Sequence, residues 1–409
     1  MNVQPDLDFI KHLKEAGGDT MKKCYQCSTC SVMCPLSKDG KPFPRKEMIW
    51  SQWGLKDKLI ADPDVFLCHQ CGDCTVNCPR GAKPGDVLGA IRSYAYTHYG
   101  WPGPLAKLCS TAKGLPVMIG LPVVIWIMMI LLSTVGLSTD FMISGFALPD
   151  AATFAKYGYT QFFGKWEFHW YAKNIFFIAI VMTPALGLGL FSCGMGVYKM
   201  WKKMAADAGL TSDFRPSVVQ FVKDFWWPAA LEIFKHNRFH ECGDQHARVK
   251  GHMPLMFAFI FLAWVTCWSL FRQDVLGLIW PEFHGPLPLT DINKIGANIA
   301  GIALLYGIGS LWINRKKTEA ETGSKGTFYD WFLIWVIAAV GVTGMGAEIL
   351  RWMTLPLAGY IVYFLHLVSI FMLFLYLPYT KFAHIVYRTA AMTFEKYRES
   401  AFVKDPLKE

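Results

Sequence analysis

Two cysteine motifs organise the N-terminal part of the chain: Cys24-Tyr-Gln-Cys27-Ser-Thr-Cys30-Ser-Val-Met-Cys34-Pro35 and Cys68-His-Gln-Cys71-Gly-Asp-Cys74-Thr-Val-Asn-Cys78-Pro79. Each reads C-x2-C-x2-C-x3-C-P. Three thiolates at the x2 spacing can hold one corner of an iron–sulfur cubane from a tight loop, whereas the fourth cysteine, followed by proline, points away. In proteins with two such motifs, the fourth cysteine ligates the other cluster.

The motifs therefore predict two [4Fe–4S] clusters with exchanged fourth ligands. We expect one cluster on Cys24, Cys27, Cys30 and Cys78, and the second on Cys68, Cys71, Cys74 and Cys34. Structural zinc would use separate C-x2-C pairs rather than two runs of three plus one. Residues 1–19 contain several charged side chains and no apolar run of signal-peptide length, so we expect this end to stay in the reducing cytoplasm, where disulfides are disfavoured.

The composition of the whole chain is unusually apolar. Of 409 residues, 53% are hydrophobic and only 17% are charged, against about 25% in an ordinary soluble domain. The mean hydropathy is +0.27. These values exclude a disordered or collagenous protein. They favour a membrane protein, because too few polar side chains are present to cover a soluble core of this size.

Six uncharged apolar runs predict membrane-spanning helices, since a helix needs about 20 residues to cross roughly 30 Å of hydrocarbon. We expect helices over about 115–137, 170–200, 252–271, 294–313, 329–350 and 357–387. Between the second and third spans, the pattern of apolar and charged residues in Pro216–His236 favours a helix in the cytoplasmic interface. The alternative is a loop packed beneath the N-terminal part.

The distribution of Lys and Arg predicts the orientation. With six spans, 34 of the 40 Lys and Arg residues fall on the side that carries both termini, and an excess of these residues marks the cytoplasmic side. We therefore expect a multi-pass protein of the cell's inner (cytoplasmic) membrane with both termini in the cytoplasm. The formal net charge of +9 then reflects this topology rather than binding to nucleic acid.

Together these features predict an all-α protein of two parts. The first, residues 1–113, is expected to be an α-helical ferredoxin domain, because apolar residues recur with a helical period between the motifs and again after Pro84. The second, residues 114–400, is expected to be a six-helix transmembrane bundle.

Two histidines lie in the segment expected to form the last span. His366 and His384 are 18 residues apart, or about five turns, so on a continuous helix they share one face and lie about 27 Å apart. That distance is nearly the thickness of the hydrocarbon core, and ionisable residues inside a membrane are usually functional. The pair therefore predicts two b-type haems, one near each leaflet.

Each haem needs a second histidine from another helix at the same depth. For His384, near the cytoplasmic end, we expect His252 at the start of the third span. For His366, toward the outer face, we expect His169, with His284 as a competitor. Three further cytoplasmic histidines could replace His252: His236, His240 and His246.

Most of residues 20–100 resemble the iron–sulfur C subunit of heterodisulfide reductase. The likeness rests on the two motifs and on Pro44-Arg-Lys46, Trp53-Gly-Leu-Lys-Asp57, Arg80-Gly81 and Ile91-Arg92. The segments Leu365–Val368 and Pro378–Ile385 resemble the last helix of the haem b subunit of respiratory nitrate reductase, in which two histidines at this spacing ligate different haems. That family carries a histidine ten residues after the equivalent of His252, where this chain has Leu262, so an outer haem must use another residue such as His169 or be absent.

A chain that fuses these two parts resembles the membrane C subunits of the quinone-interacting membrane-bound oxidoreductase complexes of sulfate reducers. The resemblance implies menaquinone as the lipid-soluble carrier, two soluble flavin- and cluster-bearing subunits as partners, and adenylylsulfate reductase as an indirect partner in sulfate respiration. We expect electrons to pass from menaquinol to the outer haem, the inner haem, the two clusters and then a cytoplasmic flavoprotein. Lys294, at the outer start of the fourth span, is a candidate hydrogen-bond donor to the quinone, with an interfacial anchor as the alternative role.

No residue of the chain looks like a nucleophile or an acid–base pair, so we expect an electron-transfer subunit of an oxidoreductase complex. Two other functions stay open. The chain could serve a heterodisulfide- or sulfite-reductase-type complex that uses quinol or methanophenazine, because other chains would bind the terminal acceptor. It could also be a haem-free ferredoxin membrane anchor in which the histidines are structural.

Overall fold

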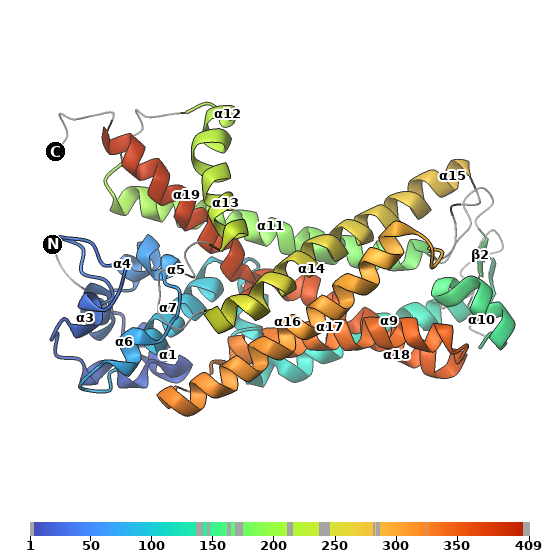
Figure 1. Ribbon diagram of the computed structural model, residues 1–409, viewed down its shortest axis with the longest axis horizontal. Helices are drawn as coiled ribbons and strands as arrows, with labels where there is room; N and C mark the ends of the chain where they lie inside the picture. The colour runs from blue at the N-terminus through green and yellow to red at the C-terminus, as the bar shows by residue number, and fades with distance from the viewer. Residues whose placement is uncertain are drawn as a thin grey trace.

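The structure, a computed structural model, describes residues 4–135, 142–144, 148–161, 165–167, 175–210, 216–236, 246–280, 283, 287–324 and 326–403. Helices dominate these residues, so the prediction of an all-α fold is confirmed. A short antiparallel pair, β1 (Met142–Ser144) and β2 (Lys165–Glu167), is a small departure from it. The molecule is elongated: α1 and the other N-terminal helices lie at one end, and β2 lies at the opposite end (Figure 1).

The N-terminal part consists of short helices around the cysteine motifs, followed by one longer helix. They are α1 (Leu7–Leu13), a π-turn (Lys14–Gly18), a 3-10 turn (Asp19–Lys23), α2 (Thr29–Val32), α3 (Arg45–Gln52), α4 (Lys56–Ala61), α5 (Pro63–Leu67), α6 (Asp73–Val76), α7 (Pro84–Tyr99), α8 (Gly103–Leu108) and a 3-10 turn (Ala112–Gly114). Asp6 caps α1 by accepting a hydrogen bond from the backbone N–H of Phe9. Pro84 begins α7, where its missing N–H costs nothing.

The hydrophobic core of the N-terminal part continues into the membrane part. Leu13, Met48 and Ile91 are buried in the same cluster as Met204 and Tyr387, which come from far along the chain. The N-terminal helices are therefore packed firmly against the rest of the molecule, rather than joined to it by a linker alone.

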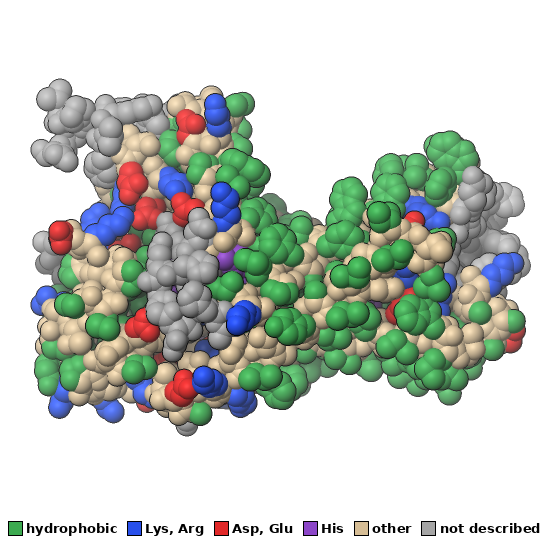
Figure 2. Space-filling view, in the orientation of Figure 1, with side chains coloured by type: hydrophobic (Ala, Val, Ile, Leu, Met, Phe, Trp, Pro, Cys, Tyr) green, Lys and Arg blue, Asp and Glu red, His purple; other side chains and the backbone are tan. Residues whose placement is uncertain are grey.

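Six of the described helices are long and apolar enough to span a membrane, so the expected multi-pass membrane protein is confirmed. They are α9 (Leu115–Val135), α11 (Ile175–Asp207), α14 (His246–Phe271), α16 (Ile292–Thr322), α17 (Phe328–Trp352) and α18 (Pro356–Tyr376). Helix α14 packs along α16, and α17 packs along α18. In Figure 2 hydrophobic side chains cover the middle of the elongated molecule, and charged side chains gather toward its ends.

The far end of the bundle carries the connecting elements. They are α10 (Ala151–Tyr157), a 3-10 turn (Gly158–Gln161), a π-turn (Arg272–Leu276) and α15 (Gly277–Ile279). At the other end, α12 (Val218–Phe221), a π-turn (Val222–Trp226) and α13 (Trp227–Lys235) form the helical segment expected in Pro216–His236. Its Phe225 and Ala229 are buried, whereas Val218, Val219 and Trp227 are exposed, which is the distribution of an amphipathic interfacial helix.

The last predicted span is not one helix, and the expectation of a continuous helix over 357–387 is wrong. Helix α18 ends at Tyr376, two 3-10 turns follow (Leu377–Tyr379 and Lys381–Ala383), and α19 (His384–Val403) begins at His384 itself. Pro378 has no N–H to donate to the helix, and Thr380 is extended, with φ −118° and ψ 178°. Helix α19 therefore leaves the bundle beside the N-terminal helices (Figure 1), and the shared helix face of His366 and His384 does not exist.

Candidate functional site

The two cysteine motifs fold in the same way. Gln26 and Ser28 in the first motif have φ of 65° and 71°, and the equivalent Gln70 and Gly72 in the second have φ of 53° and 98°. These left-handed residues, which are unfavourable for side chains other than glycine, turn each loop back before α2 and α6. Each loop is thereby curled so that three thiols can share one centre.

The thiols form two groups. Burial, and then the neighbouring Cys24, Cys27 and Cys78, raise the pKa of Cys30 to about 11. Burial, and then Cys68 and Cys71, raise the pKa of Cys34 to about 12. Burial and the neighbouring thiols Cys68, Cys71 and Cys34 likewise raise the pKa of Cys74. Cys78 therefore lies near the thiols of the first motif and Cys34 near those of the second, and the two sets of four ligands stay a prediction.

This donor set fits [4Fe–4S] clusters. Four thiolates at one point repel one another, and iron both offsets that repulsion and holds the ligands deprotonated. Backbone N–H groups also point at the sulfurs: that of Gln70 lies 3.4 Å from Sγ of Cys68, and that of Ala82 lies 3.3 Å from Sγ of Cys78. Such bonds are one means by which proteins adjust cluster potentials.

The two groups have different surroundings. In the first group, Cys27 is exposed at the surface. In the second group, Cys68 and Cys71 line a cavity of about 910 Å³ between the N-terminal part and the membrane bundle. That volume is in the range of cofactor-binding pockets.

Four histidines line the same cavity: His69, His236, His252 and His384. Its walls are largely apolar, with Leu255, Phe259, Ile308, Ile334 and Phe382 among them. Six cations also line it: Arg92, Arg248, Arg315, Lys317, Lys381 and Arg388. A largely apolar cavity with imidazoles and cations in its lining suits a haem, whose ring is apolar and whose propionates are anionic.

The ring nitrogens of two of these histidines are oriented for ligation. The Nδ1 of His384 lies 2.6 Å from the backbone oxygen of Lys381. Because that oxygen can only accept, Nδ1 carries the proton, and the lone pair for a metal is on Nε2. Burial, and then the charge of Lys381, lower the pKa of His384 to about 4, so that its imidazole is neutral. The Nδ1 of His252 is held in a similar way by His236, at 2.9 Å.

The structure brings the expected inner pair, His252 and His384, to one cavity. It does not do so for the outer pair, because His169 and its competitor His284 lie outside the described residues. His240 also lies outside them, and so does the side chain of His246.

His366 is packed against α17. Its Nδ1 lies 3.0 Å from Oγ1 of Thr343. That hydroxyl already donates to the backbone oxygen of Ala339, so it accepts from Nδ1–H of His366, and Nε2 again carries the lone pair. A Cβ at Gly344 would lie 2.9 Å from Cε1 of this ring, so the glycine makes the close approach possible.

Lys294 forms an ion pair with Glu348, and the pair joins α16 to α17. Both side chains are largely buried. This contact gives Lys294 a structural role near the far end of the bundle. Its expected contact with a quinone stays a prediction.

Arginines from the membrane part hold the second motif. Arg248 of α14 donates through Nη1 to the backbone oxygens of His69 and Gln70, at 3.0 and 3.3 Å. Arg388 of α19 donates through Nη1 to the backbone oxygen of Cys68, at 3.2 Å. The loop that presents the second thiol group is thereby tied to the two helices that carry His252 and His384.

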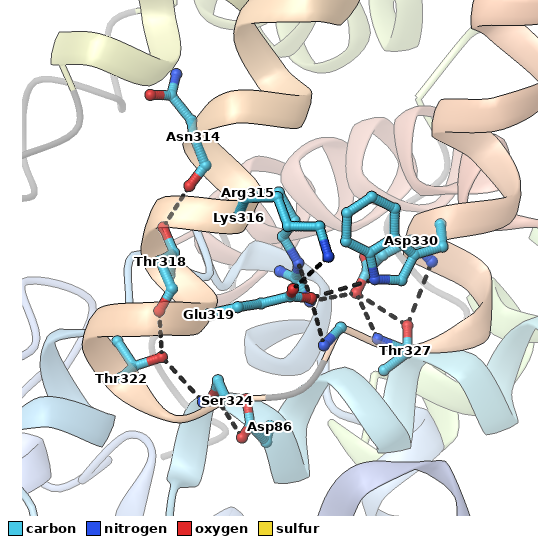
Figure 3. Close-up of polar contacts among 12 residues, drawn as sticks. Asp86, Asn314, Arg315, Lys316, Thr318, Glu319, Thr322, Ser324, Thr327 and Asp330 are labelled. Carbon is cyan, nitrogen blue, oxygen red and sulfur yellow. Dashed lines mark hydrogen bonds and ion pairs between the residues drawn. The ribbon is translucent and has the colours of Figure 1, made fainter.

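A second polar junction joins α7 to the turn between α16 and α17 (Figure 3). Ser324 donates to the carboxylate of Asp86. Asp330, which is buried, accepts from Arg315, at 2.8 Å, and from Lys381. Thr327 caps α17 and also contacts Asp330.

Several residues of the site carry no distinctive signal in the sequence. They are Arg248, Arg388, Asp330 and Thr343, none of which belongs to a motif. Only their position as polar residues within or beside apolar runs could have pointed to them.

Two family models match separate parts of the chain. A family model described as citrate utilization protein B matches residues 174–402, which is more than half of the chain. The chain belongs to this family. A model described as a 4Fe-4S dicluster domain matches residues 20–82, and with it iron–sulfur clusters in the N-terminal part are supported.

Three relatives align with different parts of the chain. Citrate utilization protein B of Escherichia coli is 24% identical over 75% of the chain and 73% of its own length. The C subunit of the H(2):CoB-CoM heterodisulfide,ferredoxin reductase of Methanothermobacter marburgensis is 33% identical over 27% of the chain. The chain covers only 63% of the length of that relative. The E subunit of the dihydromethanophenazine:CoB--CoM heterodisulfide reductase of Methanosarcina thermophila is 25% identical over 53% of the chain and 90% of its own length.

The predicted likeness to the C subunit of heterodisulfide reductase is thus confirmed. No solved structure matches the chain significantly.

Proposed function

We propose that this chain is the membrane electron-transfer subunit of an oxidoreductase complex, and that it connects menaquinol in the membrane with soluble flavin- and cluster-bearing subunits in the cytoplasm. Adenylylsulfate reductase, and hence sulfate respiration, is the proposed destination of the electrons. The observation that carries the proposal is the cavity shared by Cys68 and Cys71 with His252 and His384. It puts predicted ligands of two different redox cofactors at one junction between the membrane bundle and the N-terminal part.

The proposed cofactors are two [4Fe–4S] clusters and two b haems, which when bound supply one-electron carriers. The first group of cysteines would hold one cluster and the second group the other. His252 and His384 would hold the inner haem, and His366, with His169, the outer haem. Proteins contribute ligands, orientation and a dry environment to such carriers, and the half-buried position of the imidazoles and of the second cysteine group is consistent with that contribution.

We also propose the two-domain division at about residue 113 and the orientation with α1 and α19 in the cytoplasm. Both helices lie at the same end of the molecule (Figure 1). The excess of Lys and Arg on that side supports a cytoplasmic location. Menaquinol would then bind toward the opposite end, where Lys294 and Glu348 are paired.

A reduced-minus-oxidised spectrum of the purified protein tests the haems. We expect a b-type α-band, of which one component is lost in His384→Ala and the other in His366→Ala. A wild-type protein without the band would favour the haem-free ferredoxin anchor. Non-haem iron and acid-labile sulfide of about eight each per chain are expected for two cubanes, and much lower values would contradict the cluster assignment.

A second candidate function is favoured by the relative from Methanosarcina thermophila, 90% of whose length aligns with the chain. On that hypothesis the chain serves a heterodisulfide- or sulfite-reductase-type complex fed by quinol or a phenazine. Affinity purification of the full chain with its bound cytoplasmic subunits separates the two functions. Co-purification of flavoproteins that reduce adenylylsulfate reductase supports the first, and recovery of a protein with heterodisulfide or sulfite reductase activity supports the second.

A further inference from the structure

His236 also lines the shared cavity, and it is the C-cap of α13 rather than part of a membrane span. It ends α13 in the left-handed conformation, with φ 55° and ψ 24°, and is only 1% exposed. A left-handed residue other than glycine is uncommon and marks a position worth a functional hypothesis. Its N–H bonds the backbone oxygen of Ile233, which closes the end of the helix.

Both ring nitrogens of His236 are engaged. Its Nδ1 lies 3.2 Å from the backbone oxygen of Phe234, and its Nε2 lies 2.9 Å from Nδ1 of His252. The oxygen of Phe234 can only accept, so Nδ1 of His236 donates, and in the neutral ring Nε2 must accept. His252 therefore donates through Nδ1, which leaves Nε2 as the nitrogen that would hold a metal.

These hydrogen bonds give His236 and His252 different roles. A ligand of iron needs one ring nitrogen for the metal, and His236 uses both of its nitrogens within the protein. In metal sites, the outer partner of a ligating histidine fixes its tautomer and ring orientation and raises its basicity. The geometry of His236 and His252 is that of such a partner and its ligand.

We propose that His236 is a positioning residue for the inner haem, acting through His252 rather than ligating iron itself. This inference rests on the proposed function, because it requires a haem at this cavity. Helix α13, which carries His236, is tied to α19, which carries His384, by an ion pair of 2.6 Å between Glu232 and Lys396. Helix α19 thus positions His384 directly, and α13 positions His252 through His236.

The test compares His236→Gln, His236→Ala and His252→Ala in the full-length protein. A glutamine oxygen can still accept from Nδ1–H of His252, so His236→Gln is expected to keep both haems with nearly unchanged potentials. His236→Ala is expected to keep the haem but to raise its potential, because His252 becomes a weaker donor to ferric iron. A tenfold loss of ferric affinity, the lower end of the usual outer-shell effect, corresponds to about 59 mV in a one-electron couple.

His252→Ala should abolish the inner haem and leave the outer one. His98→Gln is the control, since His98 is an exposed histidine of α7 that does not line the cavity, and it should change neither the potentials nor the spectra. Cluster content, measured by acid-labile sulfide analysis and electron paramagnetic resonance, shows that each variant has folded.

Three results would overturn the proposal. One is loss of the inner haem in both His236→Gln and His236→Ala with retention in His252→Ala, which would make His236 the ligand. The second is a potential in His236→Ala equal to that of the wild type. The third is a wild-type protein without any b-type band; this last result refutes the proposed haems, whereas the first two leave them standing.

Discussion

Replacement of Arg388 by methionine tests how firmly the second cysteine motif is tied to the membrane helices. Arg388 belongs to α19 and donates to the backbone oxygen of Cys68 at 3.2 Å. Methionine keeps much of the side-chain length and removes the charged donor. The immediate consequence is a backbone oxygen in the motif without this partner, while the two hydrogen bonds from Arg248 remain.

The expected size of the effect follows from the kind of bond that is lost. A hydrogen bond to a charged group contributes about 1.5–3 kcal/mol to stability. Because this one is only partly buried, we expect the lower end, about 1.5 kcal/mol, which corresponds to roughly a tenfold larger population of locally opened loop.

Hydrogen–deuterium exchange of the cluster-loaded protein measures that population directly. Amides of residues 68–76 should exchange about ten times faster in Arg388→Met than in the wild type, and amides of the first motif, residues 24–32, should not change. Arg398→Met is a matched control on the same helix, because Arg398 lies outside the cavity. Equal exchange of residues 68–76 in Arg388→Met and the wild type, or an equal rise in both motifs, would refute the reasoning.

Three further predictions concern the cysteine groups, a buried carboxyl group and the outer histidine. Cys78→Ser should lower the cluster content from about eight to about four iron atoms per chain and remove the same electron paramagnetic resonance signal as Cys27→Ser, whereas a signal shared with Cys71→Ser would reverse the assignment. Burial, and then the nearby carboxyl group of Asp62, raise the pKa of Glu47 from 4.5 to about 10. The folded protein therefore keeps a proton that the unfolded chain releases, and stability falls as pH rises between these values. Glu47→Gln should accordingly raise the melting temperature more at pH 8 than at pH 5, and an equal effect at both values would contradict this. A side chain at position 344 would clash with His366, so Gly344→Ala should lower the occupancy of the outer haem and leave the inner one; an unchanged spectrum would show that His366 is not a ligand.

The cluster-binding part of the site could be predicted from sequence because its geometry is local. The spacing within Cys24–Cys34 and Cys68–Cys78 determines which three thiols share a loop, and the proline after the fourth cysteine directs it elsewhere. The six spans were predictable for a related reason. Each depends on the hydropathy of one continuous segment and not on its neighbours.

The helix break between His366 and His384 was not predicted, although Pro378 was visible in the sequence. An apolar run that continues through a proline is compatible with a kinked span as well as with a new helix. Contacts of α19 with α5 and with the helices around residues 222–235 favour the separate helix. Those contacts join residues far apart in the chain, which no local pattern records.

By itself the sequence determined the number of spans, the two cysteine motifs and the histidines available for ligation, because each depends on residue type and short-range spacing. Only the tertiary structure decided which of these groups meet. It placed two thiols of the second cysteine group and four histidines around one cavity, with Arg248 and Arg388 tying the two parts together. It also distinguished His236 from His252, because that difference lies in which ring nitrogen faces which oxygen, a matter of a few ångströms between separate helices.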